Sequence, residues 1–236
     1  MEFSGFPIIE HVSVAHVGDL DPKRKRPCSY EGRCLSVSMV PTAWAEIAKL
    51  GDHGYILTGR GRFLNVLALT DDQKLKIVEW ALSEGFLQRR RIIRLHTYDS
   101  ETDEWRYIDC TSMREAKDEA EMLDEGTFRF ERTSAPMATG KLARLAGYES
   151  EDAVDSDLSF DLALIEFASR NLDLDGVWWE EELDVDALSA PRGAIFPERV
   201  ADFTVTPATW NDLEDFEARF LCDLEDRHGA RVDLTI

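Results

Sequence analysis

The stretch Asp175-Gly-Val-Trp-Trp-Glu-Glu-Glu182 is the part of the chain from which fold and chemistry are best predicted. Its first half is apolar and rich in residues that favour β-structure, so it predicts a short buried strand. Its second half places three carboxylates directly after that strand. An acidic cluster beside two tryptophans can stabilise developing positive charge and accept a proton, although a solvated acidic loop would give the same pattern.

A helix is predicted before this strand, because apolar residues recur at helical spacing from Leu158 to Leu172. One face of that helix is expected to pack on a core. After the strand, the pattern predicts two strand-like segments, an amphipathic helix and a short terminal strand: Ala194–Pro197, Ala201–Val205, Trp210–Arg227 and Ala230–Ile236.

The first third of the chain alternates predicted strands and helices. Proline at the start of one helix suits a first helical turn, and Thr70 and Gln73 have capping-box spacing before the next. The predicted strands are Ile8–Val17, Arg33–Ser38 and Phe63–Leu69, and the predicted helices are Pro41–Leu50 and Leu75–Leu82, the latter ending near Gly85.

The middle of the chain contains a predicted hairpin. Its β-rich segments are Arg91–Tyr98 and Glu104–Cys110, which flank a polar loop. Residues 114–125 are expected to form a polar helix or an exposed arm, and residues 149–157 an acidic connector.

Length and composition predict one soluble domain over residues 1–236. A chain of 236 residues with 44% hydrophobic residues is long enough to bury one sizeable core. The N-terminus has no basic region followed by an apolar stretch, and the apolar runs are short. We therefore expect no membrane segment and a cytoplasmic location.

The charge of the chain disfavours general adhesion to nucleic acid or anionic membranes. Lysine and arginine number 27 and aspartate and glutamate 47, which gives a net charge of −20. Two basic patches interrupt this acidity, Lys23–Arg26 and Arg89–Arg91 with Arg94. Both patches are expected as solvated residues that balance a very acidic surface or as local binding patches, and Lys23–Arg26 is the only hint of a phosphate-bearing acceptor.

Cysteine and histidine show no metal-ligand spacing. The four cysteines do not form a two-residue pair, and the five histidines do not form a zinc-binding helix motif. We expect no metal and interpret the cysteines as structural thiols.

The order of several short motifs resembles the small NAD-dependent ADP-ribosyltransferases. An early strand ends in a histidine, a strand with spaced hydroxyls precedes a helix, and a late helix is followed by an Asp-Gly-Val strand and acidic residues. The segments that carry the resemblance are Val14–Gly18, Leu35–Ser38, Pro41–Trp44, Ala163–Asn171, Asp175–Val177 and Glu180–Glu182. The resemblance implies an α+β fold of split mixed and antiparallel β-sheets with flanking helices.

The resemblance also implies a site that binds NAD as a substrate. His16 would donate a hydrogen bond to a ribose hydroxyl, although a structural histidine is an equal alternative. Ser36 and Ser38 lie two apart on one strand, so both hydroxyls are expected on one face. The other residues expected at the cofactor are Val17, Gly18, Tyr30 as an aromatic platform, and Arg192 on the pyrophosphate.

The resemblance implies that an acid among Glu180, Glu181 and Glu182 stabilises the oxocarbenium-like ribose as nicotinamide leaves. The chain departs from the family pattern, because many relatives place this acid on the last strand, where Arg192 and Gly193 stand here. That departure leaves open which glutamate acts and whether the site is active.

Two functions remain from the sequence. The first is NAD-dependent transfer of ADP-ribose to a protein or nucleic-acid acceptor, with release of nicotinamide. The second is a non-enzymatic acidic interaction protein, such as an immunity, antitoxin or anti-defence factor, that blocks a basic protein partner by complementary charge.

Overall fold

The computed structural model describes residues 4–20, 31–48, 53–99, 104–121, 123, 127–184 and 189–228. The chain divides into two compact units, where the sequence predicted a single domain with an inserted hairpin. The barrel unit comprises residues Met1–Lys76 and Leu164–Ile236, and the sheet unit comprises Ile77–Ala163. Within the described ranges, none of the helices combines the length and apolar character needed to cross a membrane.

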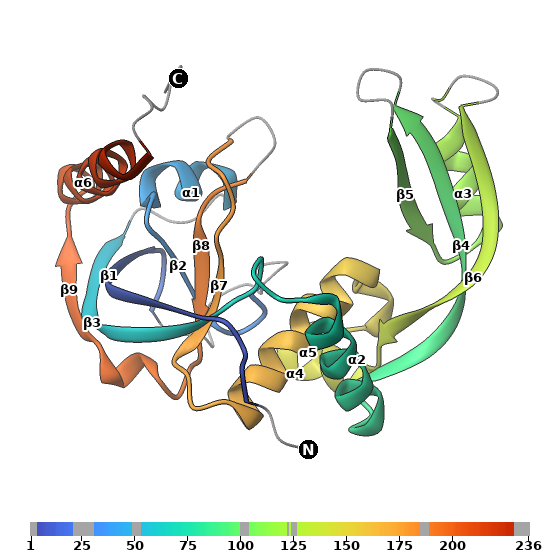
Figure 1. Cartoon of the computed structure of the whole chain (residues 1–236), viewed down its shortest axis with the longest axis horizontal. Coiled ribbons are helices and arrows are strands. Elements are labelled where there is room, and N and C mark those ends of the chain that lie inside the picture. The colour runs from blue at the N-terminus through green and yellow to red at the C-terminus, as the bar shows by residue number, and fades with distance from the viewer. Residues whose placement is uncertain are drawn as a thin grey trace. The chain divides into compact units, whose positions relative to one another are not determined.

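A six-stranded sheet forms the barrel unit (Figure 1). Its strand order is β1-β2-β8-β7-β3-β9, and a further pairing joins β1 to β3, so that five of the strands close into a ring. β3 and β7 pair in parallel, and the other pairings are antiparallel. The strands are β1 (Ile8–Val17), β2 (Leu35–Ser38), β3 (Gly54–Asn65), β7 (Gly176–Trp179), β8 (Arg192–Ile195) and β9 (Thr204–Ala208).

The three shortest strands of the ring, β2, β7 and β8, are buried at every residue. Their apolar side chains pack with Leu57 and Phe63 of β3 in one core, which also includes Trp178. Gly176 is required where β7 meets β8, because a Cβ there would lie 2.2 Å from the carbonyl oxygen of Ala194. The predicted Asp175–Trp179 strand is therefore the buried centre of this unit.

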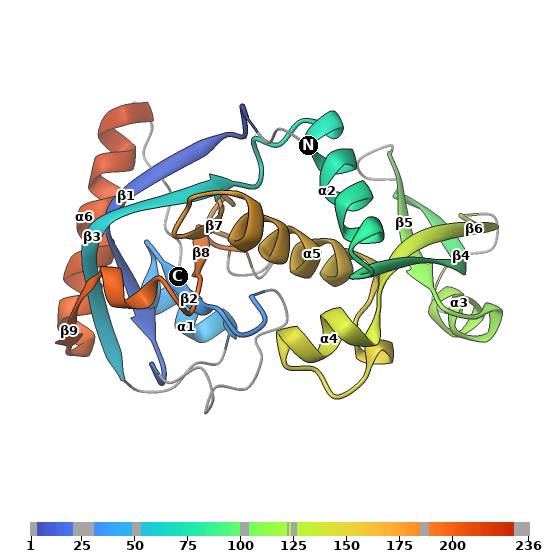
Figure 2. The ribbon, with the colours of Figure 1, turned by 90° about the horizontal axis from the view of Figure 1, so that it is seen from below.

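Helices α1 (Pro41–Ala48) and α6 (Trp210–His228) cover part of the barrel, and a short helix, η2 (Val200–Asp202), precedes β9 (Figures 1 and 2). Glu217 of α6 accepts hydrogen bonds from the Thr42 amide and hydroxyl of α1, at 2.9 and 2.5 Å. These bonds satisfy an amide at the start of α1 that has no partner within the helix.

Helices α2 (Asp71–Ser83) and α5 (Ser156–Asn171) each contain a boundary between the two units. The capping box predicted for α2 is confirmed. The Gln73 amide donates to the Thr70 hydroxyl at 3.3 Å, and the Gln73 side chain accepts from the Thr70 amide at 2.9 Å.

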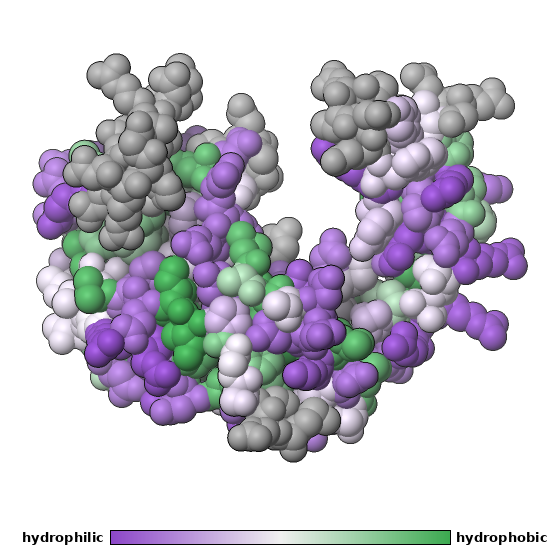
Figure 3. All heavy atoms as spheres, in the orientation of Figure 1, coloured by the Kyte–Doolittle hydropathy of each residue, from purple (hydrophilic) through white to green (hydrophobic). Residues whose placement is uncertain are grey.

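The sheet unit contains a three-stranded antiparallel sheet in the order β5-β4-β6 (Figure 1). Its elements are β4 (Leu87–Asp99), β5 (Glu104–Cys110), α3 (Met113–Ala120), β6 (Phe128–Ala138), α4 (Gly140–Ala146) and η1 (Glu151–Ala153). The predicted hairpin corresponds to β4 and β5, and the polar segment after it forms α3. In the view of Figure 3, hydrophilic and hydrophobic residues are interspersed over this unit.

The α+β class is confirmed, but several boundaries differ from prediction. The strand predicted at Phe63–Leu69 is wrong at both ends, because β3 starts at Gly54 and ends at Asn65. The Ala201–Val205 segment divides between η2 and β9, and the acidic connector contains η1 and the start of α5. β6 and α4 were not predicted. The predicted terminal strand, Lys23–Arg26 and Tyr30 lie outside the described residues.

Candidate functional site

Arg192 of β8 lies at the centre of a buried charged cluster in the barrel unit. Its Nη1 donates to Glu31 Oε1 at 2.9 Å and its Nη2 to Glu181 Oε1 at 3.2 Å. The Arg192 and Glu31 side chains are 5% and 0% exposed, whereas that of Glu181 is 25% exposed. We call these three residues, with Trp44 and Trp179, the arginine cluster.

Two tryptophan rings enclose the guanidinium. Its Cζ lies 4.4 Å from the ring centroid of Trp179 and 5.5 Å from that of Trp44. Trp179 is the cross-strand partner of Arg192 in the β7–β8 pairing, so the register places the two side chains beside each other. An aromatic face attracts a cation most where water is excluded.

The two serines predicted for the site adjoin this cluster. The Ser36 hydroxyl accepts a hydrogen bond from Trp44 Nε1 at 2.9 Å, which fixes the indole. The Ser38 hydroxyl donates to the Pro191 carbonyl at 2.5 Å and accepts from the Val40 amide at 3.0 Å. Both residues are buried, so their hydroxyls hold the protein's own framework.

His16, at the end of β1, is also buried, with 1% of its surface exposed. Its Nδ1 donates to the carbonyl oxygen of Ser36 at 2.6 Å, and its ring stacks on Tyr55 with centroids 6.2 Å apart. Val17 packs into the core, and Gly18 turns the chain with a φ of 120°, in the region that favours glycine. These contacts make His16 a link between β1 and β2.

The three glutamates of the acidic segment go to different places. Glu180 is exposed and accepts from Asn65 Nδ2 at 2.8 Å. The Glu182 side chain is exposed, while its carbonyl accepts from the Ser189 hydroxyl at 2.9 Å. Glu181 is therefore the one of the three that reaches the arginine cluster.

Arg192 is not placed as an arginine that binds a pyrophosphate would be. A guanidinium with two carboxylate partners and 5% side-chain exposure has its charge compensated inside the protein. Its contacts hold Glu31 and Glu181 at fixed positions. Because two carboxylates surround one guanidinium, the three side chains together carry a formal charge of −1 when all are ionised.

One buried acceptor in the cluster is unsatisfied. The Oε2 atom of Glu31 has no hydrogen-bond partner among the described residues. An unsatisfied buried carboxylate oxygen is costly. The arginine cluster thus contains one orphaned buried acceptor, on Glu31, and one partly exposed carboxylate, that of Glu181.

Glu31 and the cluster tryptophans were not predicted as site residues. Glu31 follows a polar loop and pairs with an arginine 161 residues away, so no local pattern marks it. Trp44 belongs to the Pro41–Trp44 segment of the resemblance, but nothing in that segment indicates that its ring contacts Arg192. In the described part of the chain, no three His, Cys, Asp or Glu side chains are grouped to hold a metal ion.

A separate pocket of about 360 Å³ in the barrel unit has a mostly apolar lining: Leu20, Arg33, Cys34, Leu35, Pro197, Val200, Ala201, Phe203 and Val205. None of the arginine-cluster residues lines it. The cluster is favoured as the candidate site because it contains paired carboxylates and an unsatisfied acceptor, whereas this pocket offers one cation on an apolar wall. Comparison with known proteins found no matching family model, curated protein or solved structure.

Proposed function

We propose that the arginine cluster is the acidic centre of a site that cleaves NAD at its nicotinamide bond and transfers ADP-ribose to a macromolecular acceptor. One observation carries this proposal. His16, Ser36, Ser38, Glu181 and Arg192, which were selected from five positions across the sequence, lie in one hydrogen-bonded neighbourhood. The spacing of these five residues along the sequence does not by itself bring them together in the fold.

Glu181 is the proposed catalytic carboxylate. As the bond from the ribose C1′ to the nicotinamide nitrogen breaks, positive charge develops on the ribose, and a nearby carboxylate stabilises it. A nucleophile of the acceptor then forms the new bond to C1′ and loses a proton, which the carboxylate or solvent accepts. The side chain of Glu181 is partly exposed, as contact with a substrate requires.

The remaining residues have positioning roles in this proposal. Arg192 holds the Glu181 carboxylate, and the two tryptophans hold Arg192. Glu31 accepts from the other Nη of Arg192 and so fixes the guanidinium on its buried side. His16 and Ser36 keep β1 and β2 in register behind the cluster, in place of the direct contacts with NAD expected from the resemblance. The acceptor is a protein or a nucleic acid.

Nicotinamide release from NAD tests this function. The full chain is incubated with NAD and with water, a basic protein or an oligonucleotide as acceptor. We expect Glu181→Gln to lower the release rate about 100-fold or more, because a positioned carboxylate contributes roughly 10²–10⁴-fold. Glu182→Gln is the matched control, since it makes the same change on an exposed neighbour outside the cluster and should leave the rate unchanged.

Melting temperatures separate a chemical effect from a folding defect. Glutamine keeps a carbonyl oxygen for Arg192, so Glu181→Gln should melt close to the unsubstituted protein. Absence of nicotinamide release with every acceptor, together with no rise of melting temperature with NAD, would overturn the enzymatic function. Salt-sensitive binding of a basic protein in that case would support the acidic interaction protein instead.

A further inference from the structure

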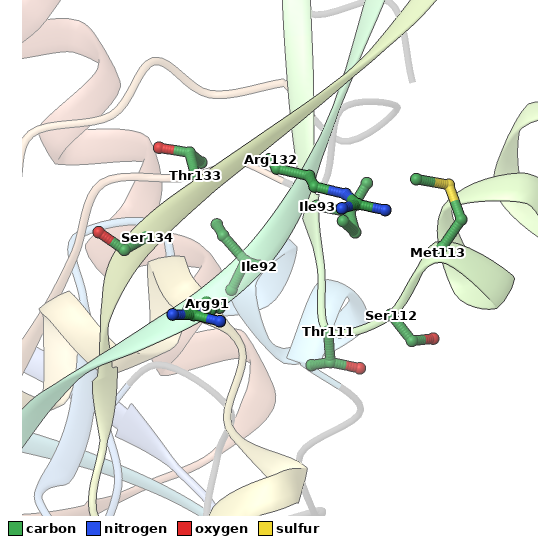
Figure 4. A pocket seen from close by; sticks show the side chains of 9 residues that line it. All are labelled: Arg91, Ile92, Ile93, Thr111, Ser112, Met113, Arg132, Thr133 and Ser134. Carbon is green, nitrogen blue, oxygen red and sulfur yellow. The ribbon is translucent and has the colours of Figure 1, made fainter.

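The sheet unit contains a pocket of about 730 Å³ between β4, β6 and the start of α3 (Figure 4). That volume lies within the range of small-molecule sites in proteins. We call this pocket the arginine groove; its lining residues are Arg91, Ile92, Ile93, Thr111, Ser112, Met113, Arg132, Thr133 and Ser134. All of them belong to the sheet unit.

Arg91 and Arg132 lie on the same face of the sheet. Arg91 pairs with Ser134, and Arg132 is two residues before Ser134 on β6, so the two arginines are diagonal cross-strand neighbours. In Figure 4, the Arg132 side chain extends towards Met113 at the start of α3. Two guanidinium groups at this spacing repel each other unless solvent or an anion lies between them.

Neither groove arginine has an ion-pair partner among the described residues. On the opposite face of β4, by contrast, Arg90 pairs with Glu151, and Arg94 donates two hydrogen bonds to Asp109 at 2.7 and 2.9 Å. In a chain with 47 acidic and 27 basic residues, a carboxylate is the most abundant charged partner. In the groove, two neighbouring exposed cations thus face solvent without a carboxylate partner among the described residues.

Hydroxyl groups and an apolar wall complete the groove. Thr111 and Ser112 precede α3, and Ser134 lies opposite Arg91. The nearby Glu115 carboxylate is already engaged in the helix cap, because Oε2 accepts from the Thr111 amide and hydroxyl at 2.7 and 2.6 Å. The side chains of Ile93 and Met113 supply apolar contact beside the cations.

The strands of the sheet also carry a local excess of positive charge. They contain seven arginines and four carboxylates: Arg89, Arg90, Arg91, Arg94, Arg106, Arg129 and Arg132 against Asp99, Glu104, Asp109 and Glu131. The field of nearby charges, rather than the net charge of the whole chain, governs an anion that has reached the pocket.

We propose that the arginine groove binds the phosphate groups of a nucleotide-sized ligand. Arg91 and Arg132 contact the phosphate oxygens, for which the planar guanidinium has matching geometry. Ser112 and Ser134 offer hydroxyl donors, and Ile93 with Met113 contacts the apolar part of the ligand. This proposal is independent of ADP-ribosyl transfer, because every residue it uses lies in the sheet unit.

Calorimetric titration of the full chain with ADP tests the proposal. Replacing both groove arginines, as Arg91→Gln with Arg132→Gln, should weaken ADP binding about 100-fold or more, because two charged hydrogen bonds of roughly 1.5 kcal/mol or more each are lost. Arg129→Gln is the control. It removes the same charge from the same strand, three residues away and hence on the opposite face of the sheet.

Further arms identify the chemistry and the location. Adenosine, which lacks phosphate, should bind far more weakly than ADP, and the control Arg129→Gln should leave ADP binding unchanged. Absence of ADP binding, or equal binding by the double variant, overturns the proposal. Tighter binding of a short single-stranded DNA than of ADP, lost in the double variant, would overturn it in favour of a nucleic-acid surface.

Discussion

The arginine cluster of the barrel unit and the arginine groove of the sheet unit use the same side chain under opposite conditions. Arg192 is almost fully buried, and its guanidinium contacts two carboxylates and two indole rings. Arg91 and Arg132 are exposed, and no described carboxylate pairs with them. The charge of the buried arginine must therefore be neutralised by the protein itself, whereas the charges of the exposed arginines can be neutralised by a ligand.

The reason is the cost of removing a charge from water. A buried guanidinium is tolerated only when its partners repay most of its desolvation, so its contacts are fixed at folding. An exposed guanidinium remains hydrated and needs no partner for stability. The difference teaches that substitution of the buried Arg192 should act mainly on folding, whereas substitution of the groove arginines should act mainly on binding.

The largest expected effect comes from Arg192→Met. This change leaves Glu31, which is 0% exposed, as an unpaired buried carboxylate. Removing one partner of a buried pair costs about 3–5 kcal/mol of unfolding free energy. Urea denaturation followed by tryptophan fluorescence measures this loss.

The matched change in the groove is Arg132→Met, which should alter the unfolding free energy by only about 0.5 kcal/mol, as is usual for exposed positions. Adding Glu31→Gln to Arg192→Met should restore part of the lost stability, because the orphaned charge is removed as well. Equal effects of the two arginine substitutions would show that burial does not distinguish the two sites.

His11 gives the next largest effect and extends the comparison to histidines. Its ring lies 4.1 Å from that of Trp178, and burial lowers its pKa from 6.5 to about 4, against an opposing attraction from Glu180. His11 is thus neutral in the folded protein at pH 5, whereas in the unfolded chain it is mostly protonated. Stability is lost as the pH falls from about 6.5 towards 4.

Between pH 7 and pH 5, this linkage should remove roughly 2 kcal/mol of unfolding free energy. His11→Phe should remove that part of the pH dependence, measured as the difference between the two proteins at each pH. His96→Phe in the sheet unit is the control, since the His96 ring contacts Glu131 of the same sheet at 2.8 Å. If the unfolding free energy of His11→Phe fell between pH 7 and pH 5 as much as that of the unsubstituted protein, burial of the neutral ring would be contradicted.

Much of the fold could be predicted from local patterns. β1 matches its predicted bounds, and α2, α5, β7 and α6 lie within a few residues of theirs, because apolar periodicity and caps mark them. β6 was not predicted, because five of its eleven residues are exposed and it contains Pro136. A proline is tolerated there because β6 lies at the edge of its sheet.

The candidate site was predicted only in part. His16, Ser36, Ser38 and Arg192 do share one neighbourhood, yet the sequence assigned them direct contact with NAD, and the structure has them buried in contacts with the protein. Burial depends on how β2 and β8 pair, which no single segment encodes. The Glu31–Arg192 pair likewise follows from strand pairing over a long sequence separation.

Gly85 carries a smaller predicted effect than Arg192 or His11, and its comparison with Gly176 shows what a glycine does in each unit. Gly176 of the barrel unit is required for space, but a Cβ at Gly85 would meet nothing within 4 Å. Gly85 instead ends α2 in a Schellman motif: its φ is 69°, its amide donates to Leu82, and the next amide, of Phe86, donates to Ala81.

Gly85→Ala should therefore cost about 1 kcal/mol through its left-handed backbone alone, measured as a shift of the urea midpoint. Gly85→Asn should cost less, because asparagine tolerates this conformation better than alanine does. Since the site has open space, the larger asparagine side chain brings no clash. A greater loss with asparagine than with alanine would mean that space, and not backbone conformation, selects glycine at the end of α2.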